Sequence, residues 1–304
     1  MISTIKLVFL GTSGSWPSPE RGMPSIGVQL DSECILFDVG EGTQRQLMMS
    51  SLSFMKITKI FITHFHGDHF LGLGGLIQTM TLNDRKEKLE IYGPPDTIRQ
   101  VSTFLNLGYY SLSFPIFVRE IEDNEVLDFG DYTIKAIRAK HPVHSFSYIL
   151  KEKDRKRISR ELMEKYSLTS KEVDIITRNG SINKNGKIIT LDDISDGIRK
   201  GRSIVYSGDT SPNDLLAEES KNMKIMVHEA TVDSSLESKA NEYGHSSARQ
   251  AAELAKKANV EYLYLTHISP RYRADKVKLI ENEAKSIFEK TVVARDFMEI
   301  MVQV

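Results

Sequence analysis

The chain has 304 residues, of which 40% are hydrophobic and 27% are charged. These proportions are typical of a globular protein with a sizeable core, and they exclude a disordered or fibrous chain. The formal net charge is −1, so any attraction for a polyanion must come from a local basic surface. No apolar run approaches the roughly 20 residues that span a bilayer. A single cysteine, Cys34, cannot form an internal disulfide. We therefore expect a cytoplasmic protein with no membrane span.

The first half of the chain alternates apolar segments of strand length with amphipathic segments of helical length. In chain order, the pattern predicts strands at Leu7–Leu10 and Ile35–Asp38, a helix at Thr43–Ser51, a strand at Ile57–Thr63, a helix at Phe70–Leu82, a strand at Leu89–Tyr92 and a hairpin at Val126–Lys140. Cys34 borders the second of these strands, and we interpret it as a buried strand residue rather than a nucleophile. Strands that alternate with helices indicate an α/β layered fold.

The segment Lys151–Leu191 interrupts this alternation. It contains eleven Lys and Arg against six Asp and Glu, and turn-forming Asn and Gly residues fill Asn179–Gly186. We predict one domain over residues 1–304, in which residues 151–191 form an inserted flexible arm. On charge alone, a solvated excursion is the simpler interpretation of this arm.

Alternation resumes after the insertion. The pattern predicts strands at Ser203–Ser207 and Ile225–His228, a helix at Ser246–Lys257, a strand at Tyr262–Thr266 and a helix at Asp275–Glu289. The layered α/β organisation therefore continues to the last third of the chain.

A cluster of imidazoles directly follows the predicted strand Ile57–Thr63. The residues have the pattern H-x-H-x-D-H, and Gly67 between them permits a sharp turn. Crowded histidines repel one another when protonated and lose hydrogen bonds when buried neutral, and a bound cation removes both costs. Imidazole and carboxylate together suit borderline divalent ions such as zinc. The four candidate ligands are His64, His66, Asp68 and His69.

Three later predicted strands also end in a candidate ligand. His141 and His144 follow the hairpin, Asp209 follows Ser203–Ser207, and His267 follows Tyr262–Thr266. With the first cluster, these residues supply enough donors for two ions that share one bridging carboxylate.

This order of residues resembles the metallo-β-lactamase superfamily over essentially the whole chain. Four finer motifs resemble one family within it, ribonuclease Z, the endonuclease that removes 3′ trailers from precursor tRNA. The motifs are Phe37–Gln44, Val227–Thr231, Gly244–Ala248 and Leu265–Tyr272. The resemblance implies a four-layer αββα sandwich. It also implies a zinc-dependent endoribonuclease that cuts after the discriminator nucleotide, leaving a 3′-hydroxyl on the tRNA and a 5′-phosphate on the trailer.

The resemblance further implies two zinc ions per subunit, with manganese as an alternative in turnover. One ion is expected on three histidines, the second on an aspartate and two histidines, and one aspartate is expected to bridge them. These ligands are His64, His66 and His141, then Asp68, His69 and His267, with Asp209 as the bridge. The family pattern selects His141, and His144 competes with it as a ligand.

Catalytic roles also follow from the resemblance. Asp68 is expected to orient or deprotonate the attacking water, and His245 to protonate the leaving 3′ oxygen while Glu229 holds it. Asp38 is expected to hydrogen-bond a ligand histidine, although a helix cap is an alternative for it. His228 should point to the opposite face from Glu229 and either serve in packing or support a ligand from outside the site.

The resemblance implies tRNA contacts as well. Arg271, Ser269 and Ser247 are expected to contact phosphate, and Lys151–Leu191 lies where the family carries a flexible exosite for tRNA. This segment lacks the family's Gly-Pro element. Family members are usually homodimers, in which one subunit's arm holds the tRNA that the other cuts. An alternative function on the same scaffold is a phosphodiesterase or arylsulfatase for a small substrate, which would not need the arm.

The loop Gly14–Ser25 departs from the family pattern, in which it influences the treatment of a 3′ CCA sequence. Gly22 and Pro19 replace the usual Asn and Lys, so we make no prediction about CCA discrimination. Trp16 in this loop can stack on a base or anchor the loop, and we favour anchoring.

Overall fold

The computed structural model describes residues 2–109, 111–273 and 275–303. The chain divides into two compact units. The larger unit comprises residues 1–150 and 203–303, and the smaller unit comprises Lys151–Arg202. Each unit has a hydrophobic core of its own.

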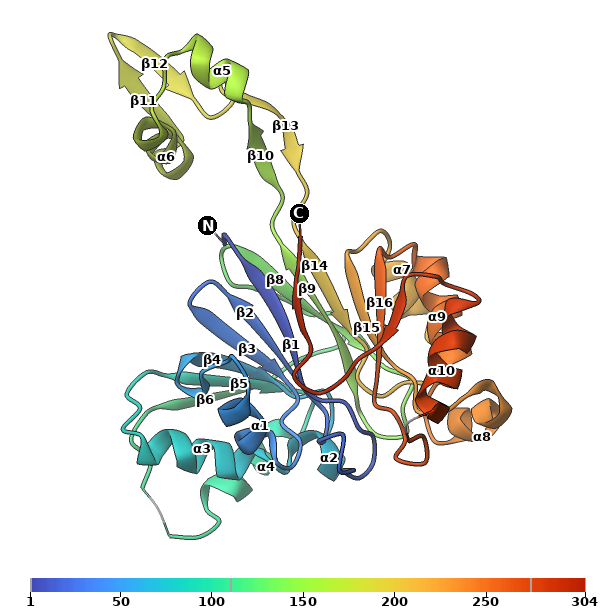
Figure 1. Cartoon of the computed structure of the whole chain (residues 1–304). Coiled ribbons are helices and arrows are strands. Elements are labelled where there is room, and N and C mark those ends of the chain that lie inside the picture. The colour runs from blue at the N-terminus through green and yellow to red at the C-terminus, as the bar shows by residue number, and fades with distance from the viewer. Residues whose placement is uncertain (1, 110, 274, 304) are drawn as a thin grey trace. The chain divides into compact units, whose positions relative to one another are not determined.

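Two seven-stranded sheets form the centre of the larger unit (Figure 1). The first sheet has the spatial order β18-β1-β2-β3-β4-β5-β6, and its strands from β3 to β6 are parallel. The bounds are β1 Ile5–Gly11, β2 Ser25–Leu30, β3 Glu33–Phe37, β4 Ile57–Phe61, β5 Leu89–Gly93, β6 Ile116–Glu120 and β18 Glu299–Met301.

The second sheet has the spatial order β17-β16-β15-β14-β9-β8-β7, and its strands from β14 to β17 are parallel. The bounds are β7 Val126–Asp128, β8 Tyr132–Arg138, β9 Phe146–Glu152, β14 Ser203–Tyr206, β15 Ile225–Glu229, β16 Tyr262–Thr266 and β17 Thr291–Val293.

Helices cover the outer face of each sheet (Figure 1). The first sheet is covered by α1 Thr43–Met49, α3 Leu73–Leu82 and α4 Thr97–Leu105, with α2 Gly67–Phe70 and the 3-10 turn Phe54–Lys56 nearby. The second is covered by α7 Asp214–Glu219, α9 Ala248–Ala258 and α10 Asp275–Lys285, with α8 Glu237–Glu242 and the 3-10 turn Ser234–Leu236. The order of layers is helix, sheet, sheet, helix, and it confirms the predicted αββα sandwich.

Burial on both faces explains why the strands are so apolar. In β1, Leu7 and Phe9 face the core between the sheets, whereas Val8 and Leu10 face the helices outside the first sheet. A strand that is covered on both sides needs a continuous apolar run rather than an alternating pattern. This is the pattern from which the strands were predicted.

Most predicted elements are present, and their ends shift by a few residues. The hairpin is formed by β7 and β8, and Cys34 is buried in β3, where burial raises the pKa of its thiol to about 12. The helix expected at Phe70–Leu82 starts later, because α2 ends at Phe70 and α3 begins at Leu73. The Gly72 amide donates to Val39 O, and a Cβ on Gly72 would lie 2.1 Å from Gly40 O, so this close approach of two backbones interrupts the helix.

The smaller unit contains two strand pairs and two helices. Antiparallel β10 and β13 pair with each other, as do β11 and β12. The bounds are β10 Arg155–Ile158, α5 Arg160–Lys165, α6 Ser170–Asn179, β11 Ser181–Lys184, β12 Lys187–Thr190 and β13 Ser195–Arg199. The predicted arm stopped at Leu191, and the unit continues to Arg202 because β13 returns to pair with β10.

Local signals explain the elements of this unit. Thr169 and Glu172 form a capping box at the start of α6, and Gly180 ends the helix with a φ of 84°. Asn185 and Gly186 both have positive φ and turn the β11–β12 hairpin. A small core holds these elements together: Val173, Ile176, Ile189 and Ile194. Among the helices that the structure describes in either unit, none is long and apolar enough to cross a bilayer.

Candidate metal centre

The predicted ligands come together where strands of the two sheets end. His64 follows β4 and leads to α2, which carries Asp68 and His69. Asp209 follows β14 and His267 follows β16. Strands that run parallel within each sheet present their carboxyl ends at one edge, and the packing of the two sheets brings these edges together.

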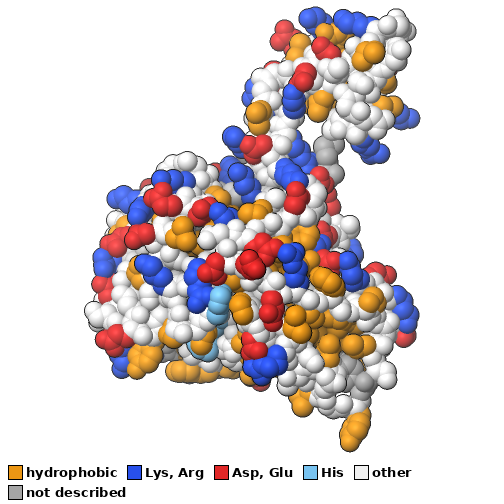
Figure 2. All heavy atoms as spheres, turned by 180° about the vertical axis from the view of Figure 1, so that it is seen from behind, with side chains coloured by type: hydrophobic (Ala, Val, Ile, Leu, Met, Phe, Trp, Pro, Cys, Tyr) orange, Lys and Arg blue, Asp and Glu red, His pale blue; other side chains and the backbone are white. Residues whose placement is uncertain are grey.

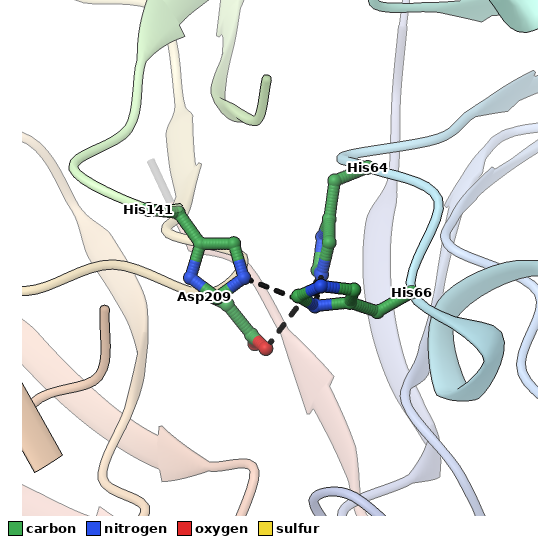
Figure 3. A group of neighbouring side chains, drawn as sticks. All are labelled: His64, His66, His141 and Asp209. Carbon is green, nitrogen blue, oxygen red and sulfur yellow. Dashed lines mark hydrogen bonds and ion pairs between the residues drawn. The ribbon is translucent and has the colours of Figure 1, made fainter. Parts of the chain in front are cut away.

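The first group of candidate ligands is His64, His66, His141 and Asp209 (Figure 3). One ligand atom from each lies within 4.8 Å of all the others. His66 Nδ1 is 3.0 Å from His64 Nε2 and 3.1 Å from His141 Nε2. The other nitrogen of His141, Nδ1, is 2.9 Å from Gly244 O and donates to this carbonyl. Nε2 of His141 is therefore free to bind a cation.

The second group is Asp68, His69, Asp209 and His267, again with ligand atoms within 4.8 Å of one another. His267 Nε2 is 3.3 Å from both Asp209 Oδ1 and Asp68 Oδ2. The other oxygen of Asp209, Oδ2, lies 3.3 Å from His69 Nε2 and 3.8 Å from His64 Nε2. The Asp209 carboxylate therefore lies between the two groups, in the position of a shared ligand.

The unsatisfied atoms of this cluster match the requirements of divalent cations. His69 Nε2 and Asp209 Oδ1 are buried, and neither makes a hydrogen bond within the described residues. Such atoms are costly without a partner, and a bound cation would provide one. The mixture of imidazole nitrogen and carboxylate oxygen is the donor set that zinc uses in catalytic sites. The residues present therefore fit a metal centre.

The electrostatics of the side chains lead to the same conclusion. Burial lowers the pKa of His64 well below its ordinary value. Burial also opposes protonation of His69, but the Asp209 and Asp38 carboxylates outweigh it and hold the His69 pKa well above the ordinary value. Burial would raise the pKa of Asp209, but His267 and His69 hold it well below the ordinary value. The Asp209 and Asp38 carboxylates thus stabilise positive charge among the candidate ligands. A bound metal cation would supply that charge.

Asp38 accepts a hydrogen bond from a residue of the candidate ligand cluster but is not itself among the candidate ligands. Its Oδ2 accepts from His69 Nδ1 at 2.7 Å and from the Tyr206 hydroxyl at 2.9 Å. Its Oδ1 accepts from the Thr63 backbone amide at 2.7 Å. Asp38 does not cap α1, because the cap of that helix is Gly42.

His245 and Glu229 form a pair beside the candidate metal ligands. His245 Nδ1 is 3.0 Å from Glu229 Oε1, which also accepts from the Thr210 backbone amide at 2.9 Å. Burial disfavours protonation of His245, but Glu229 outweighs it and raises the pKa of His245 to about 9. His228 is fully buried, and its Nδ1 lies 2.7 Å from Glu229 O rather than among the metal ligands.

Other sequence candidates lie around this centre or away from it. His144 is outside both groups, with Nε2 3.2 Å from Asp123 Oδ1. Arg271 Nε donates to Ser269 Oγ at 3.2 Å. Ser247 is the cap of α9, where its hydroxyl accepts from the Gln250 amide.

The Trp16 side chain is 57% exposed, so its ring does not anchor the loop by burial as we had expected. The same loop contacts the centre through its backbone instead, because the Ser15 amide donates to Asp68 Oδ2 at 2.9 Å. A cavity of about 820 Å³ lies along this loop, and its lining includes Arg21, Arg45, Tyr272 and Arg273. The buried Arg21 donates to Thr12 Oγ1 and Ala294 O, which fixes one wall of the cavity.

Sequence reasoning missed several groups that contact the ligands. Thr63 and Thr231 each have a hydroxyl within hydrogen-bonding distance of a ligand histidine. Both lie shortly after the end of a strand. Thr63 is next to His64 and Thr231 belongs to the Val227–Thr231 motif, and this position could have identified them from the sequence. The Tyr206 hydroxyl and the Ser15 amide had no such signal, because their contacts come from distant segments.

Comparison with known proteins gives consistent matches. A family model described as Beta-lactamase superfamily domain matches residues 194–268, and one described as Anti-Pycsar protein Apyc1 matches residues 5–185. The chain is 47% identical to Ribonuclease Z of Thermoplasma acidophilum over 100% of the chain and 98% of that relative. It is 43% identical to Ribonuclease Z of Archaeoglobus fulgidus over 98% of the chain and 97% of that relative. The crystal structure of human tRNase Z, short form (ELAC1), is 30% identical with a TM-score of 0.74, and the match covers 98% of this chain and 100% of that one.

Proposed function

This chain belongs to the ribonuclease Z family, and from that premise we propose that it is a zinc-dependent endoribonuclease that removes the 3′ trailer of precursor tRNA. It would cut after the discriminator nucleotide and leave a 3′-hydroxyl on the tRNA and a 5′-phosphate on the trailer. The observation that carries this proposal is the pair of complete donor groups that share Asp209, in a chain similar to ribonuclease Z over its full length. The relatives do not favour the alternative of a small-substrate phosphodiesterase or arylsulfatase. The match to the Apyc1 model covers only residues 5–185, whereas the ribonuclease Z relatives match the whole chain.

We assign two zinc ions to the centre, with manganese as an alternative in turnover. One ion would be held by His64, His66 and His141, the other by Asp68, His69 and His267, with Asp209 between them. When bound, two such cations supply positive charge that stabilises the attacking and leaving oxygens of a phosphodiester displacement. A non-catalytic tRNA-binding protein would have no need for the complete donor set.

Asp68 is our candidate for positioning or deprotonating the water that attacks the phosphate. The Ser15 amide fixes one oxygen of its carboxylate. Burial favours the neutral acid, but a hydrogen bond with His267 and the charge of His69 hold the pKa of Asp68 below its ordinary value. A carboxylate that stays ionised can accept a hydrogen bond from water throughout the reaction, which favours the positioning role.

His245 is our candidate for the general acid. Because Glu229 raises its pKa to about 9, the ring is protonated at neutral pH. Glu229 accepts from Nδ1, which leaves Nε2 as the atom that donates a proton to the departing 3′ oxygen. Glu229 is a positioning residue in this scheme, because it acts through His245.

Contacts with RNA phosphates are assigned to Arg271 and Ser269, which follow the ligand His267 on the same loop. The Arg271 side chain already donates a hydrogen bond to the Ser269 hydroxyl, so the two side chains are close enough for one phosphate to contact both. Ser247 was also a candidate, but its hydroxyl would have to leave the cap of α9 to bind phosphate.

We propose that the unit Lys151–Arg202 is the tRNA-binding exosite, including the predicted segment 151–191. It contains fourteen Lys and Arg against nine Asp and Glu, and Lys and Arg side chains lie at several places on its visible surface (Figure 2). Lys165 and Lys187 both approach the Tyr166 ring, with Nζ 5.6 Å and 4.7 Å from its centre. A-form RNA is bound mainly through its backbone and shape, for which dispersed cations are suited.

We further infer a homodimer in the cytoplasm. The family resemblance implies a dimer in which the exosite of one subunit holds the tRNA that the other subunit cuts. The buried free thiol of Cys34 is compatible with a reducing compartment. Sedimentation velocity at micromolar concentration tests the dimer, because a single species of about twice the 34.4 kDa chain mass is expected.

The deciding experiment is incubation of the purified protein with a 3′-extended tRNA transcript, followed by mapping of both product ends. We expect one cut after the discriminator nucleotide, loss of cleavage with a chelator and its return with zinc or manganese. Cleavage that is indifferent to the chelator would contradict the metal assignment. Hydrolysis of a small phosphodiester without cleavage of the transcript would support the alternative function.

A further inference from the structure

Two buried threonines each stand between a ligand histidine and a carboxylate. Thr231 Oγ1 lies 2.6 Å from Glu229 Oε2 and 2.9 Å from His267 Nδ1. Thr231, Glu229 and His267 are all buried, so water does not compete for these hydrogen bonds. A hydroxyl has one proton to donate and lone pairs that accept. The direction of each hydrogen bond can therefore be derived.

The hydroxyl of Thr231 donates to Glu229, because a carboxylate accepts hydrogen bonds and cannot donate one when ionised. Thr231 Oγ1 has then used its only proton, so the contact with His267 must be made by an N–H of the ring. His267 Nδ1 carries this proton and donates it to Thr231. Its Nε2, which faces Asp209 and Asp68 at 3.3 Å, is thereby left as the atom that binds a cation.

The same arrangement occurs on the first sheet. Thr63 Oγ1 lies 3.0 Å and 2.9 Å from the two oxygens of Asp38 and 3.0 Å from His64 Nδ1. If the Thr63 proton goes to the carboxylate, His64 Nδ1 must donate to Thr63, and His64 Nε2 is left for a cation. Asp38 also accepts from His69 Nδ1, so the series is His64, Thr63, Asp38 and His69.

We propose that Thr231 is a positioning residue that fixes the protonation of His267 for metal binding and couples this ligand, through Glu229, to His245. The series His267, Thr231, Glu229 and His245 repeats the series on the first sheet, with one difference. On the first sheet both end histidines are candidate metal ligands, whereas here one end is a ligand and the other is the candidate general acid. This inference rests on the proposed metal centre.

The coupling gives Glu229 two tasks. Its Oε1 holds His245, and its Oε2 accepts from Thr231 and so makes His267 a stronger ligand. Removal of a residue that hydrogen-bonds a metal ligand commonly lowers metal affinity 10- to 100-fold. Loss of the Thr231 hydroxyl should therefore lower the affinity for the ion at the group that contains His267. The affinity for the ion at the group of His64, His66 and His141 should not change.

The test compares zinc-loaded wild-type protein with Thr231→Val, which keeps the shape and removes the hydroxyl, and with Thr231→Ser, which restores it. The matched control is Thr291→Val, because Thr291 is also buried but its hydroxyl donates to the Phe288 carbonyl, away from the metal ligands. Zinc content is measured after dialysis against increasing chelator. The histidine ring nitrogens are observed by ¹⁵N NMR, which distinguishes Nδ1–H from Nε2–H.

We expect Thr231→Val to lose one of two zinc ions at a chelator concentration about 10- to 100-fold lower than the wild type does. Thr231→Ser and Thr291→Val should retain both ions. The wild-type spectrum should show His267 protonated at Nδ1, a readout that needs no variant and therefore does not depend on whether Thr231→Val folds. His267 protonated at Nε2, or wild-type zinc retention in a folded Thr231→Val protein, would overturn the inference. Wild-type protein that binds no zinc would instead refute the proposed function.

Discussion

The candidate metal centre of the larger unit and the charged surface of Lys151–Arg202 use ionisable groups in opposite ways. His64, His69 and Asp209 are almost completely buried, and each contacts several other members of the cluster. In the smaller unit most charged side chains are exposed, and pairs such as Arg157 with Asp196 are separate from one another. Glu152 and Arg202 are exceptions, since both are buried and pair with each other, and Glu152 also contacts Arg155 and Arg199.

This difference predicts how each region responds to substitution. Groups in a buried network share partners, so the loss of one member affects the others and the effects are not additive. Exposed charges contribute little each, and their effects on RNA binding should add and depend on salt. Four changes to the chain test this contrast.

The largest effect is expected for Asp68→Ala at the metal centre. Turnover on precursor tRNA should fall by about 10⁴-fold, because the group that positions the attacking water is lost. Dissociation constants from filter binding should change less than about threefold, since Asp68 makes no proposed contact with tRNA outside the scissile phosphate. Asp214→Ala is the control, because the Asp214 side chain is 81% exposed and belongs to neither group of candidate ligands. An Asp68→Ala enzyme with wild-type turnover would refute the proposed role.

Replacement of residues 153–201 by a short Gly-Ser linker should have the next largest effect. This change keeps the backbone hydrogen bond from Glu152 N to Arg202 O. The kcat/KM for precursor tRNA should fall by about 10³-fold because several phosphate contacts are lost together. Hydrolysis of bis(p-nitrophenyl) phosphate should stay within about twofold. An equal loss of both activities would mean that this unit supports the metal centre rather than tRNA binding.

Ile176→Ala tests whether the smaller unit depends on its own core. Ile176 is fully buried among Val173, Ile189 and Ile194, so the unit should lose about 2–3 kcal/mol of its free energy of unfolding. Hydrogen exchange followed by mass spectrometry should show faster exchange in residues 151–202 and unchanged exchange in the β-sheets of the larger unit. Ile175→Ala is the matched control, because Ile175 is 41% exposed and its truncation should cost less than about 1 kcal/mol. Uniformly faster exchange across both units would contradict the independence of this core.

The smallest effect is expected for the double substitution of Lys165→Gln and Lys187→Gln. Affinity for precursor tRNA should fall only a few-fold, and the slope of log K against log salt should become shallower by about 2, one for each phosphate contact. Lys257→Gln on the larger unit is the control, since Lys257 pairs with Asp214 and should leave the slope unchanged. An unchanged slope in the double variant would remove these two lysines from the RNA-binding surface.

The sequence by itself determined the layered α/β fold and most candidate ligands. Apolar runs of strand length mark strands that are buried on both faces, and a histidine or aspartate directly after such a run must lie at a sheet edge. The H-x-H-x-D-H cluster is local, so its residues are close together in any fold. This is why His64 to His69 could be identified before any tertiary structure was known.

The tertiary structure decided which distant groups meet. It placed Asp209 between two donor groups, His141 rather than His144 among the candidate ligands, and Thr231 between Glu229 and His267. These distances depend on how the two sheets pack and on which side chains each loop turns inward. A one-dimensional pattern specifies where a strand ends, but not what lies opposite that end.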